Sequence, residues 1–123
     1  MIWFMVALGG ATGSVLRYGV GRLAVTYLGP STFLDTLFVN VTGAFALGLF
    51  ITFALERVHV PDELRGVVAV GFLGGYTTFS TLAFEAVRLA ESGELLRAGA
   101  SLLGNIVLGL LAAYLGIIAA RSF

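Results

Sequence analysis

Long apolar stretches separated by short polar connections fill the whole chain. A helix needs about 20 mostly apolar residues to cross the roughly 30 Å hydrocarbon core of a bilayer. Four stretches are long enough, and they cover residues 2–27, 34–55, 66–89 and 98–120. The connections GPSTF, ERVHVPDELR and AESGELLR hold both prolines and most of the charges. The pattern therefore predicts an all-α membrane protein with four transmembrane helices in a single domain, residues 1–123.

Composition supports the membrane class and argues against several others. Hydrophobic residues make up 59% of the chain and charged residues only 11%, whereas a soluble domain has about 25% charged residues. The net charge is zero, so no basic patch favours a polyanion and we expect no nucleic-acid partner. The chain has no cysteine and one histidine, His59, in a charged connection. It has neither a catalytic constellation nor a P-loop, so the sequence does not predict an enzyme.

The seven arginines are divided almost evenly between the two sides that four spans would define. One side has Arg57, Arg65 and Arg121, and the other has Arg17, Arg22, Arg88 and Arg97. An excess of basic residues on one side normally fixes the orientation of a membrane protein. Without that excess, copies could insert both ways and pair about a two-fold axis in the membrane plane. The sequence therefore predicts an antiparallel, dual-topology homodimer.

Glycine accounts for 17 residues, roughly twice its average share of about 7%. Lipid gives helices little hydrophobic reason to associate, so small residues that let backbones approach closely are favoured at their contacts. Gly9, Gly10 and Gly13 form one small-residue face, and Gly43 and Gly48 form another. We expect these faces to pack tightly in a compact bundle.

The stretch GFLGGYTTFSTLAFE, residues 71–85, is the most informative part of the chain. Three glycines lie within five residues, and four hydroxyl side chains follow: Thr77, Thr78, Ser80 and Thr81. Each mid-helix glycine costs about 1 kcal/mol of helix propensity, so we expect the third helix to break near residues 74–78. Backbone outside a helix is tolerated at membrane depth only when it is buried in protein or lines a water-filled cavity. Freed carbonyls there would suit a hard cation, and freed N–H groups or hydroxyls an anion. The alternative is that the glycines serve packing and the hydroxyls bond their own helix.

Asn40 and Thr36 lie one turn apart on the same face of the second predicted helix. An amide facing lipid would be costly, so Asn40 must face protein, water or a substrate. Its N–H donors suit an anion, and the alternative is a hydrogen bond to another helix. Asn105 in the fourth predicted helix is a further buried amide, for which a packing role is favoured.

Arg17, Glu85 and Phe79 are the other side chains with candidate chemistry. Arginine is costly near the bilayer centre. Arg17 and Arg22 could draw anions into a vestibule, or they could snorkel to the interface, which suits Arg22 better. Glu85 could carry a proton, pair with an arginine or lie at the interface. The positive ring edge of Phe79 could meet an anion, and its alternative role is to fill core space.

Two other functions fit a small dual-topology membrane protein. A proton-coupled exporter of cations or drugs needs a membrane-embedded carboxylate, but the first predicted helix has none and Glu85 follows the expected break. A purely structural assembly subunit has no need of a disrupted helix. Ion flux separates the three: a channel conducts without a proton gradient, an exporter requires one, and an assembly subunit conducts nothing.

The motifs GFLGGYTTFSTLAFE, TLFVN and GGATGSVLRYG resemble those of the Fluc fluoride channel family, also called CrcB. The resemblance covers essentially the whole chain. It implies passive, highly selective export of fluoride across the cytoplasmic membrane, which relieves fluoride toxicity in microbes. It also implies a dual-topology homodimer with two antiparallel pores. A heterodimer with a paralogue is the alternative, and the balanced arginines favour the homodimer.

The resemblance also implies roles for single residues. A structural sodium ion would lie at the dimer interface, held by the backbone carbonyls of Gly74 and Thr77 from each copy. The family's pore and vestibule positions fall on Asn40, Phe79, Ser80, Thr81, Leu82, Arg17 and Glu85. Thr36, one turn before Asn40, and Asn105, which lies near a looser family position in the fourth predicted helix, are added as pore support. The family usually reads TTFSTF, so Leu82 replaces the second pore phenylalanine, with bulk but no electropositive ring edge. The expected partners are fluoride, a second copy of the chain and the lipid bilayer.

Overall fold

The computed structural model describes residues 1–30 and 32–123; Ser31, in the expected connection GPSTF, lies outside the described residues. Every regular element within the described residues is helical. In chain order they are α1 (Ile2–Leu28), α2 (Leu34–Phe53), the π-helical η1 (Ala54–Val58), α3 (Asp62–Arg65), the π-helical η2 (Gly66–Leu73), α4 (Gly74–Tyr76), α5 (Phe79–Glu91) and α6 (Leu95–Arg121). The predicted all-α class is therefore confirmed, and all four apolar stretches are helical with ends shifted by a few residues.

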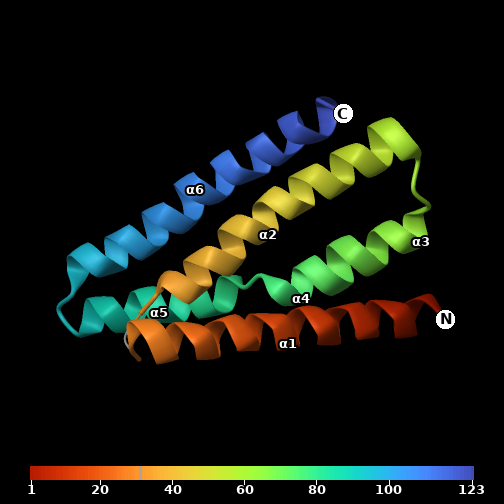
Figure 1. Ribbon diagram of the computed structural model, residues 1–123. Coiled ribbons are helices and arrows are strands. Elements are labelled where there is room, and N and C mark those ends of the chain that lie inside the picture. The colour runs from red at the N-terminus through yellow and green to blue at the C-terminus, as the bar shows by residue number, and fades with distance from the viewer. Residues whose placement is uncertain (31) are drawn as a thin grey trace.

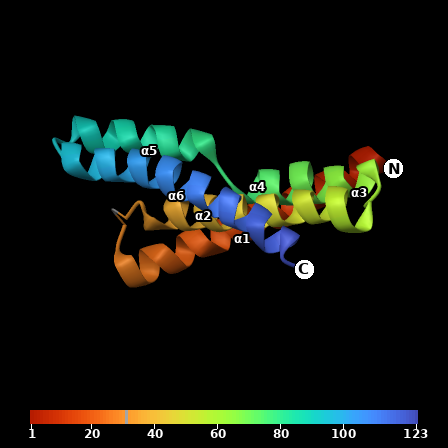
Figure 2. The ribbon, with the colours of Figure 1, turned by 90° about the horizontal axis from the view of Figure 1, so that it is seen from above.

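The helices form two pairs. Figure 1 shows α2 and α6 side by side along most of their length, and α1 beside the line formed by α3, η2 and α4. At the end of α4 the chain leaves this line, and α5 packs against α6 instead, as Figure 2 shows from above. Both termini lie at the same end of the molecule. The path from η2 to α5 therefore joins the two pairs.

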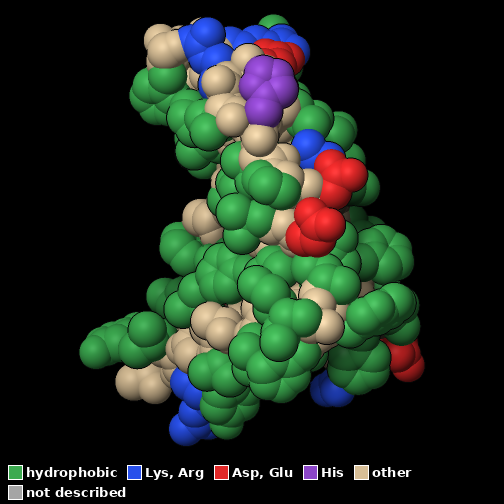
Figure 3. Space-filling model, turned by 90° about the vertical axis from the view of Figure 1, so that its right-hand side faces the viewer, with side chains coloured by type: hydrophobic (Ala, Val, Ile, Leu, Met, Phe, Trp, Pro, Cys, Tyr) green, Lys and Arg blue, Asp and Glu red, His purple; other side chains and the backbone are tan. Residues whose placement is uncertain are grey.

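Three helical stretches are long and apolar enough to cross a membrane: Leu34–Val58, Asp62–Glu91 and Leu95–Arg121. The 27-residue helix α1 is long enough but is not among them. Arg17, Arg22 and its many glycines make it less apolar than the other three. The four-span count therefore stays a prediction, while the membrane-spanning character of the chain is confirmed. Figure 3 agrees with this character, since hydrophobic side chains cover most of the face it presents.

Glycine brings backbones into contact in both pairs of helices. A Cβ atom at Gly9 would come 2.8 Å from the Val67 carbonyl oxygen, and one at Gly13 would overlap the Phe72 carbonyl. In the other pair, a Cβ atom at Gly48 would overlap the Ala113 carbonyl of α6. These positions tolerate no side chain without backbone movement, so the small-residue faces set how closely the helices approach.

The helical path is interrupted between α4 and α5. Thr77 has φ −92° and ψ 163°, and Thr78 has φ −153° and ψ 122°, so both residues are extended. Gly74 and Gly75, which lie within the expected region, are helical. β-branched threonine favours extended backbone, and the Thr78 hydroxyl caps α5 by accepting a bond from the Thr81 N–H. The change of direction thus falls on the threonines, and Gly75 serves the contact with α1, where it faces Gly10.

Candidate functional site

Asn40 of α2 holds the interruption from one side. Its Oδ1 accepts a hydrogen bond from the Thr78 N–H at 2.9 Å, and its Nδ2 donates to the Thr78 carbonyl at 3.0 Å. The same Nδ2 donates to Asn105 Oδ1 of α6 at 2.7 Å. Asn105 Nδ2 donates in turn to the Ser101 carbonyl at 2.7 Å. The interhelical hydrogen bond that the sequence allowed for Asn40 is present, since Nδ2 donates to protein acceptors on two other helical segments.

These bonds change which backbone carbonyls are satisfied. In a continuous helix, the Thr78 N–H would bond the Gly74 carbonyl, and the Thr81 N–H would bond the Thr77 carbonyl. The Thr78 N–H instead bonds Asn40, and the Thr81 N–H bonds the Thr78 hydroxyl at 3.2 Å. The carbonyls of Gly74 and Thr77 therefore lose their helical donors. They are the two carbonyls that the resemblance assigns to a cation.

Arg17 of α1 holds the interruption from the other side. Its Nε donates to the Gly75 carbonyl at 3.0 Å. That carbonyl would bond the N–H of Phe79 in a continuous helix, so the guanidinium group replaces a lost helical bond. The sequence suggested a vestibule role for Arg17, and the structure adds this capping contact.

An apolar groove of 600 Å³ runs along α2, α4, α5 and α6. Its lining includes these expected site residues: Asn40, Gly74, Thr77, Phe79, Leu82 and Asn105. Phe79 is 80% exposed, whereas Leu82 is 6% exposed. The phenylalanine ring therefore stands away from its own helix bundle, and the leucine that replaces the second ring is packed inward.

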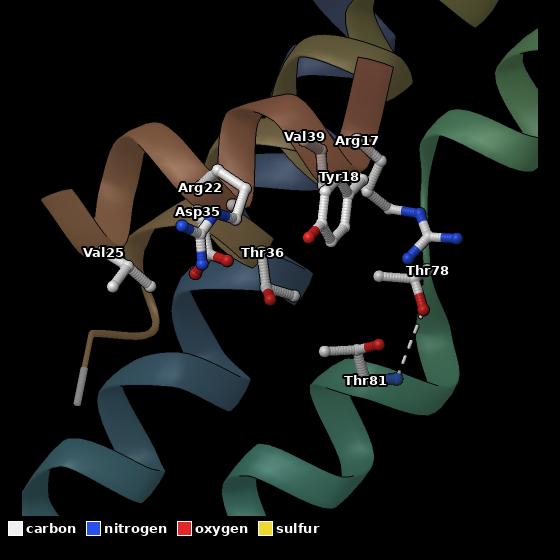
Figure 4. A pocket seen from close by; sticks show the side chains of 10 residues that line it. Arg17, Tyr18, Arg22, Val25, Asp35, Thr36, Val39, Thr78 and Thr81 are labelled. Atoms are coloured by element: carbon white, nitrogen blue, oxygen red, sulfur yellow. Dashed lines mark hydrogen bonds between the residues drawn. The ribbon is translucent and has the colours of Figure 1, made fainter. Parts of the chain in front are cut away.

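A second hollow, a cavity of 250 Å³, lies between α1, α2 and α5. Its polar lining consists of Arg17, Tyr18, Arg22, Asp35, Thr36, Thr78 and Thr81. Figure 4 shows the Arg17 guanidinium group near Thr78, and the Arg22 group beside Asp35 on the other side of the cavity. The cavity therefore brings together two cationic groups and several hydroxyls that the sequence had suggested separately.

Asp35 is a cavity residue that the sequence analysis did not select. Its Oδ1 atom is buried and has no hydrogen-bond partner among the described residues. A Cβ atom added to Gly21 of α1 would lie 3.4 Å from Asp35 Oδ2, so the carboxylate lies close to α1. The only feature of the sequence that could have drawn attention to Asp35 is its position in the first turn of a helix. Carboxylates are common there because of the helix dipole, so that signal does not distinguish a cavity role.

Glu85 lies where this cavity approaches another hollow of 240 Å³, which it lines together with Phe84 and Arg88. Its carboxylate lies beside Thr36, a side chain that is only 3% exposed. Glu85 Oε1 is buried without a partner in the described part of the chain. Arg88 lies over the Phe84 ring, 5.7 Å from its centroid. Thr36 and Glu85 thus form a polar contact between the two hollows.

The hydroxyl side chains at and after the interruption lie in different places. Thr81 lines the cavity of Figure 4, whereas Ser80 is exposed and does not line it. Ser80 Oγ lies 3.4 Å from Thr78 Oγ1. Thr78 lines both the cavity and the groove. The cluster of hydroxyls therefore reaches from the cavity toward the groove through Thr78.

Side chains do not form an obvious metal centre. Among the described residues there is no group of three or more His, Cys, Asp or Glu side chains that could hold a metal ion. A cation at this site would have to be bound by backbone carbonyls, and those of Gly74 and Thr77 have lost their helical donors.

Comparison with known proteins gives one consistent result. Residues 4–117 match the family described as CrcB-like protein, Camphor Resistance (CrcB). The fluoride-specific ion channel FluC of Rhizobium etli is 42% identical over 119 residues, 97% of this chain and 95% of the relative. The channel of that name from Thermus thermophilus is 46% identical over 114 residues, 93% of this chain and 90% of the relative. The one from Aquifex aeolicus is 41% identical over 119 residues, 97% and 96% of the two chains.

Proposed function

This chain belongs to the CrcB family, and we propose that it is a passive channel that is highly selective for fluoride. The family is one of ion channels and not of enzymes. Its apolar helices and its channel relatives identify the chain as a multi-pass protein of the cell membrane. The channel exports fluoride across that membrane and so relieves its toxicity. A proton-coupled exporter of cations or drugs has no support among the relatives named above, each of which is called a fluoride-specific ion channel.

The proposed channel has four transmembrane helices, with α1 as the first and the interrupted helix as the third. The support for a break inside the membrane is the polar bonding around it. Extended backbone in lipid needs partners from the protein, and Asn40 supplies them to both backbone groups of Thr78. The guanidinium group of Arg17 does the same for the Gly75 carbonyl. Arg17 therefore has a part-buried partner, which lowers the cost of placing α1 in the membrane.

The proposed assembly is an antiparallel, dual-topology homodimer with two antiparallel pores. The apolar groove supports this assembly, because a second copy would cover it and the 80% exposed Phe79 ring. Polar groups at the interruption would then be shielded from lipid on the open side. The even division of arginines gives copies of both orientations.

We propose a structural sodium ion where the two copies meet. The residues fit it, because hard cations prefer oxygen ligands and the carbonyls of Gly74 and Thr77 have lost their helical donors. Both residues line the groove that the second copy would cover. Two copies would thus offer two carbonyls each. When bound, the ion would supply a fixed positive charge beside the anion path.

The fluoride path begins at the cavity of Figure 4. Its two arginines raise the local concentration of anions. Fluoride is strongly hydrated, so donors must replace its water, and Thr36, Thr81 and Ser80 offer hydroxyls in and beside the cavity. Glu85 lies beside Thr36 and, as an acceptor, would orient that hydroxyl.

The path continues at the groove, past Asn40 and the Phe79 ring. An ion that reaches Asn40 competes with Asn105 Oδ1 for one N–H, so Asn105 is a reserve acceptor when no ion is present. Phe79 offers a ring edge without a strong donor, which lets an ion leave again. Leu82 adds packing but no ring edge.

The observation that carries this proposal is the interrupted helix, whose polar groups Asn40 and Arg17 hold next to a cavity and a groove, in a chain of this family. The experiment is fluoride efflux from liposomes that contain purified protein and a potassium ionophore, with chloride efflux as the control. We expect rapid loss of fluoride, no loss of chloride and no need for a proton gradient. Absence of fluoride loss from a well-folded dimer would contradict the proposal.

A further inference from the structure

Tyr76, the last helical residue before the interruption, contacts α2 through its hydroxyl. The side chain is buried, and its oxygen lies 2.9 Å from Thr42 Oγ1. Thr42 Oγ1 also lies 2.7 Å from the Phe38 carbonyl of its own helix, to which it donates. A hydroxyl has one proton to donate, so Tyr76 must be the donor in the bond to Thr42.

The next residue of α2, Gly43, packs against both Tyr76 and Thr77. A Cβ atom at Gly43 would overlap the Thr77 methyl group and lie 3.3 Å from the Tyr76 ring. On the far side, the Phe72 ring is parallel to the Tyr76 ring within 2°, with centroids 6.2 Å apart. The Tyr76 side chain is therefore fixed at its ring and at its hydroxyl, and Thr77 packs directly against the same stretch of α2.

The bond lies between Gly74 and Thr77, whose carbonyls have lost their helical donors. Gly74 is two residues before Tyr76, and Thr77 follows it directly. The neighbouring backbone groups have their own side-chain partners, since Arg17 bonds the Gly75 carbonyl and Asn40 bonds Thr78. If this segment were held only at the Gly75 carbonyl and at Thr78, the backbone between those two points could still rotate. The hydroxyl bond removes that freedom at the centre of the segment.

We propose that the hydrogen bond from Tyr76 to Thr42 is a positioning contact that orients the Gly74 and Thr77 carbonyls for a cation. This inference rests on the sodium site of the proposed function. Tyr76 does not touch the ion, because it does not line the groove on which those carbonyls lie. Its contribution is preorganisation: ligands already held in their binding geometry lose less freedom when the ion binds.

The test is a sodium titration of thermal stability in detergent, with choline replacing sodium at constant ionic strength. Tyr76→Phe removes the donor and keeps the ring, and Thr42→Val removes the acceptor and keeps the shape. We expect each variant to raise the half-saturating sodium concentration about three- to tenfold, as loss of one hydrogen bond predicts. Since both changes remove the same bond, the double variant should show no larger shift than either single one.

Two matched controls keep the effect specific. Tyr114→Phe removes a tyrosine hydroxyl from an exposed position on α6. Thr12→Val removes a hydroxyl that bonds its own helix at the Leu8 carbonyl, 2.9 Å away, on the exposed side of α1. Both should leave the half-saturating sodium concentration unchanged.

An unchanged sodium titration in Tyr76→Phe would overturn the inference, even if the variant melted at a lower temperature without sodium. Such a result would mean that the bond only stabilises packing. A wild-type protein that sodium does not stabilise would also overturn it, together with the sodium site. Fluoride efflux from liposomes would then report separately whether the channel function stands.

Discussion

The two halves of the interrupted helix are built in different ways. The first half, η2 and α4, touches α1 backbone to backbone, with Gly75 facing Gly10 and Gly13 facing Phe72. The second half, α5, turns away from α1 and packs against α6, while its hydroxyl and carboxylate side chains line the hollows. Both halves come from one apolar stretch of the sequence.

The difference suggests that the two halves of this helix have different roles, support in the first half and contact with ions in the second. Backbone contact leaves no room for adjustment, so the first half is a rigid support for the carbonyls at its end. The second half keeps its side chains free to meet ions. The interruption joins them, and Arg17, Asn40 and Thr42 hold it from neighbouring helices. Changes in the first half should therefore affect folding, and changes in the second half should affect flux.

Breaking the backbone contact of the first half should have the largest effect. In Gly13→Ala the new methyl group would overlap the Phe72 carbonyl and lie 2.9 Å from the Tyr76 nitrogen. Neither group can move without shifting a helix, so we expect a loss of at least about 1–3 kcal/mol. The measurement is the melting temperature of purified protein in detergent. Gly19→Ala, on the same helix with no neighbour within 4 Å, is the control, and equal melting temperatures would contradict the rigid support.

Asn40→Asp acts at the interruption and should abolish fluoride flux. A carboxylate cannot donate to the Thr78 carbonyl or to Asn105 Oδ1, and it places a negative charge in an anion path. We expect efflux to fall at least about a hundredfold, the equivalent of two lost donor bonds. Liposome efflux is the measurement, with gel filtration to establish that the variant is folded. Flux at the native rate would refute the role of Asn40.

Two substitutions in the second half should change efflux less, and they should distinguish the role of Phe79 from that of Leu82 on α5. Phe79 is exposed toward the groove and Leu82 is packed inward, so we expect Phe79→Leu to reduce efflux roughly tenfold at an unchanged melting temperature. Leu82→Phe overfills a packed site and should cost about 1–3 kcal/mol of stability, with less change in flux. If Leu82→Phe alters efflux more than Phe79→Leu, the ring at Phe79 is not the main aromatic contact of the path.

Much of this division could be predicted from the sequence, because its signals are local. Hydropathy and length predicted the helices, and the cluster of glycines and hydroxyls predicted a break over residues 74–78, a stretch that contains the extended Thr77 and Thr78. The sequence did not show whether the glycines or the threonines would leave the helix. The glycines at positions 74 and 75 remain helical, and the two threonines are extended. Backbone contact with Gly10 of α1 fixes Gly75 in place.

The partners of the site residues could not be predicted from the sequence. Arg17 bonds a carbonyl 58 positions away, Asn40 bonds one 38 positions away, and Tyr76 bonds a hydroxyl 34 positions away. Helical periodicity indicates which face of a helix is polar, but it carries no information on which helix lies opposite that face. For the same reason Thr42 and Asp35 passed unnoticed, one as an ordinary helix hydroxyl and the other as an ordinary first-turn carboxylate.

The smallest effect should come from the outer arginine of the cavity. Arg22 is exposed, so its attraction for anions is screened over a distance of about 10 Å at 0.1 M salt. We expect Arg22→Gln to slow efflux about two- to fivefold at low ionic strength and hardly at all at high ionic strength, with sodium held constant. Arg17→Gln is the contrast, because its guanidinium group bonds the Gly75 carbonyl and salt cannot replace that bond. Its defect should be larger and should persist at both ionic strengths. The same salt dependence in both variants would mean that Arg17, too, acts only through its charge, and the support at the interruption would then come from α2 alone.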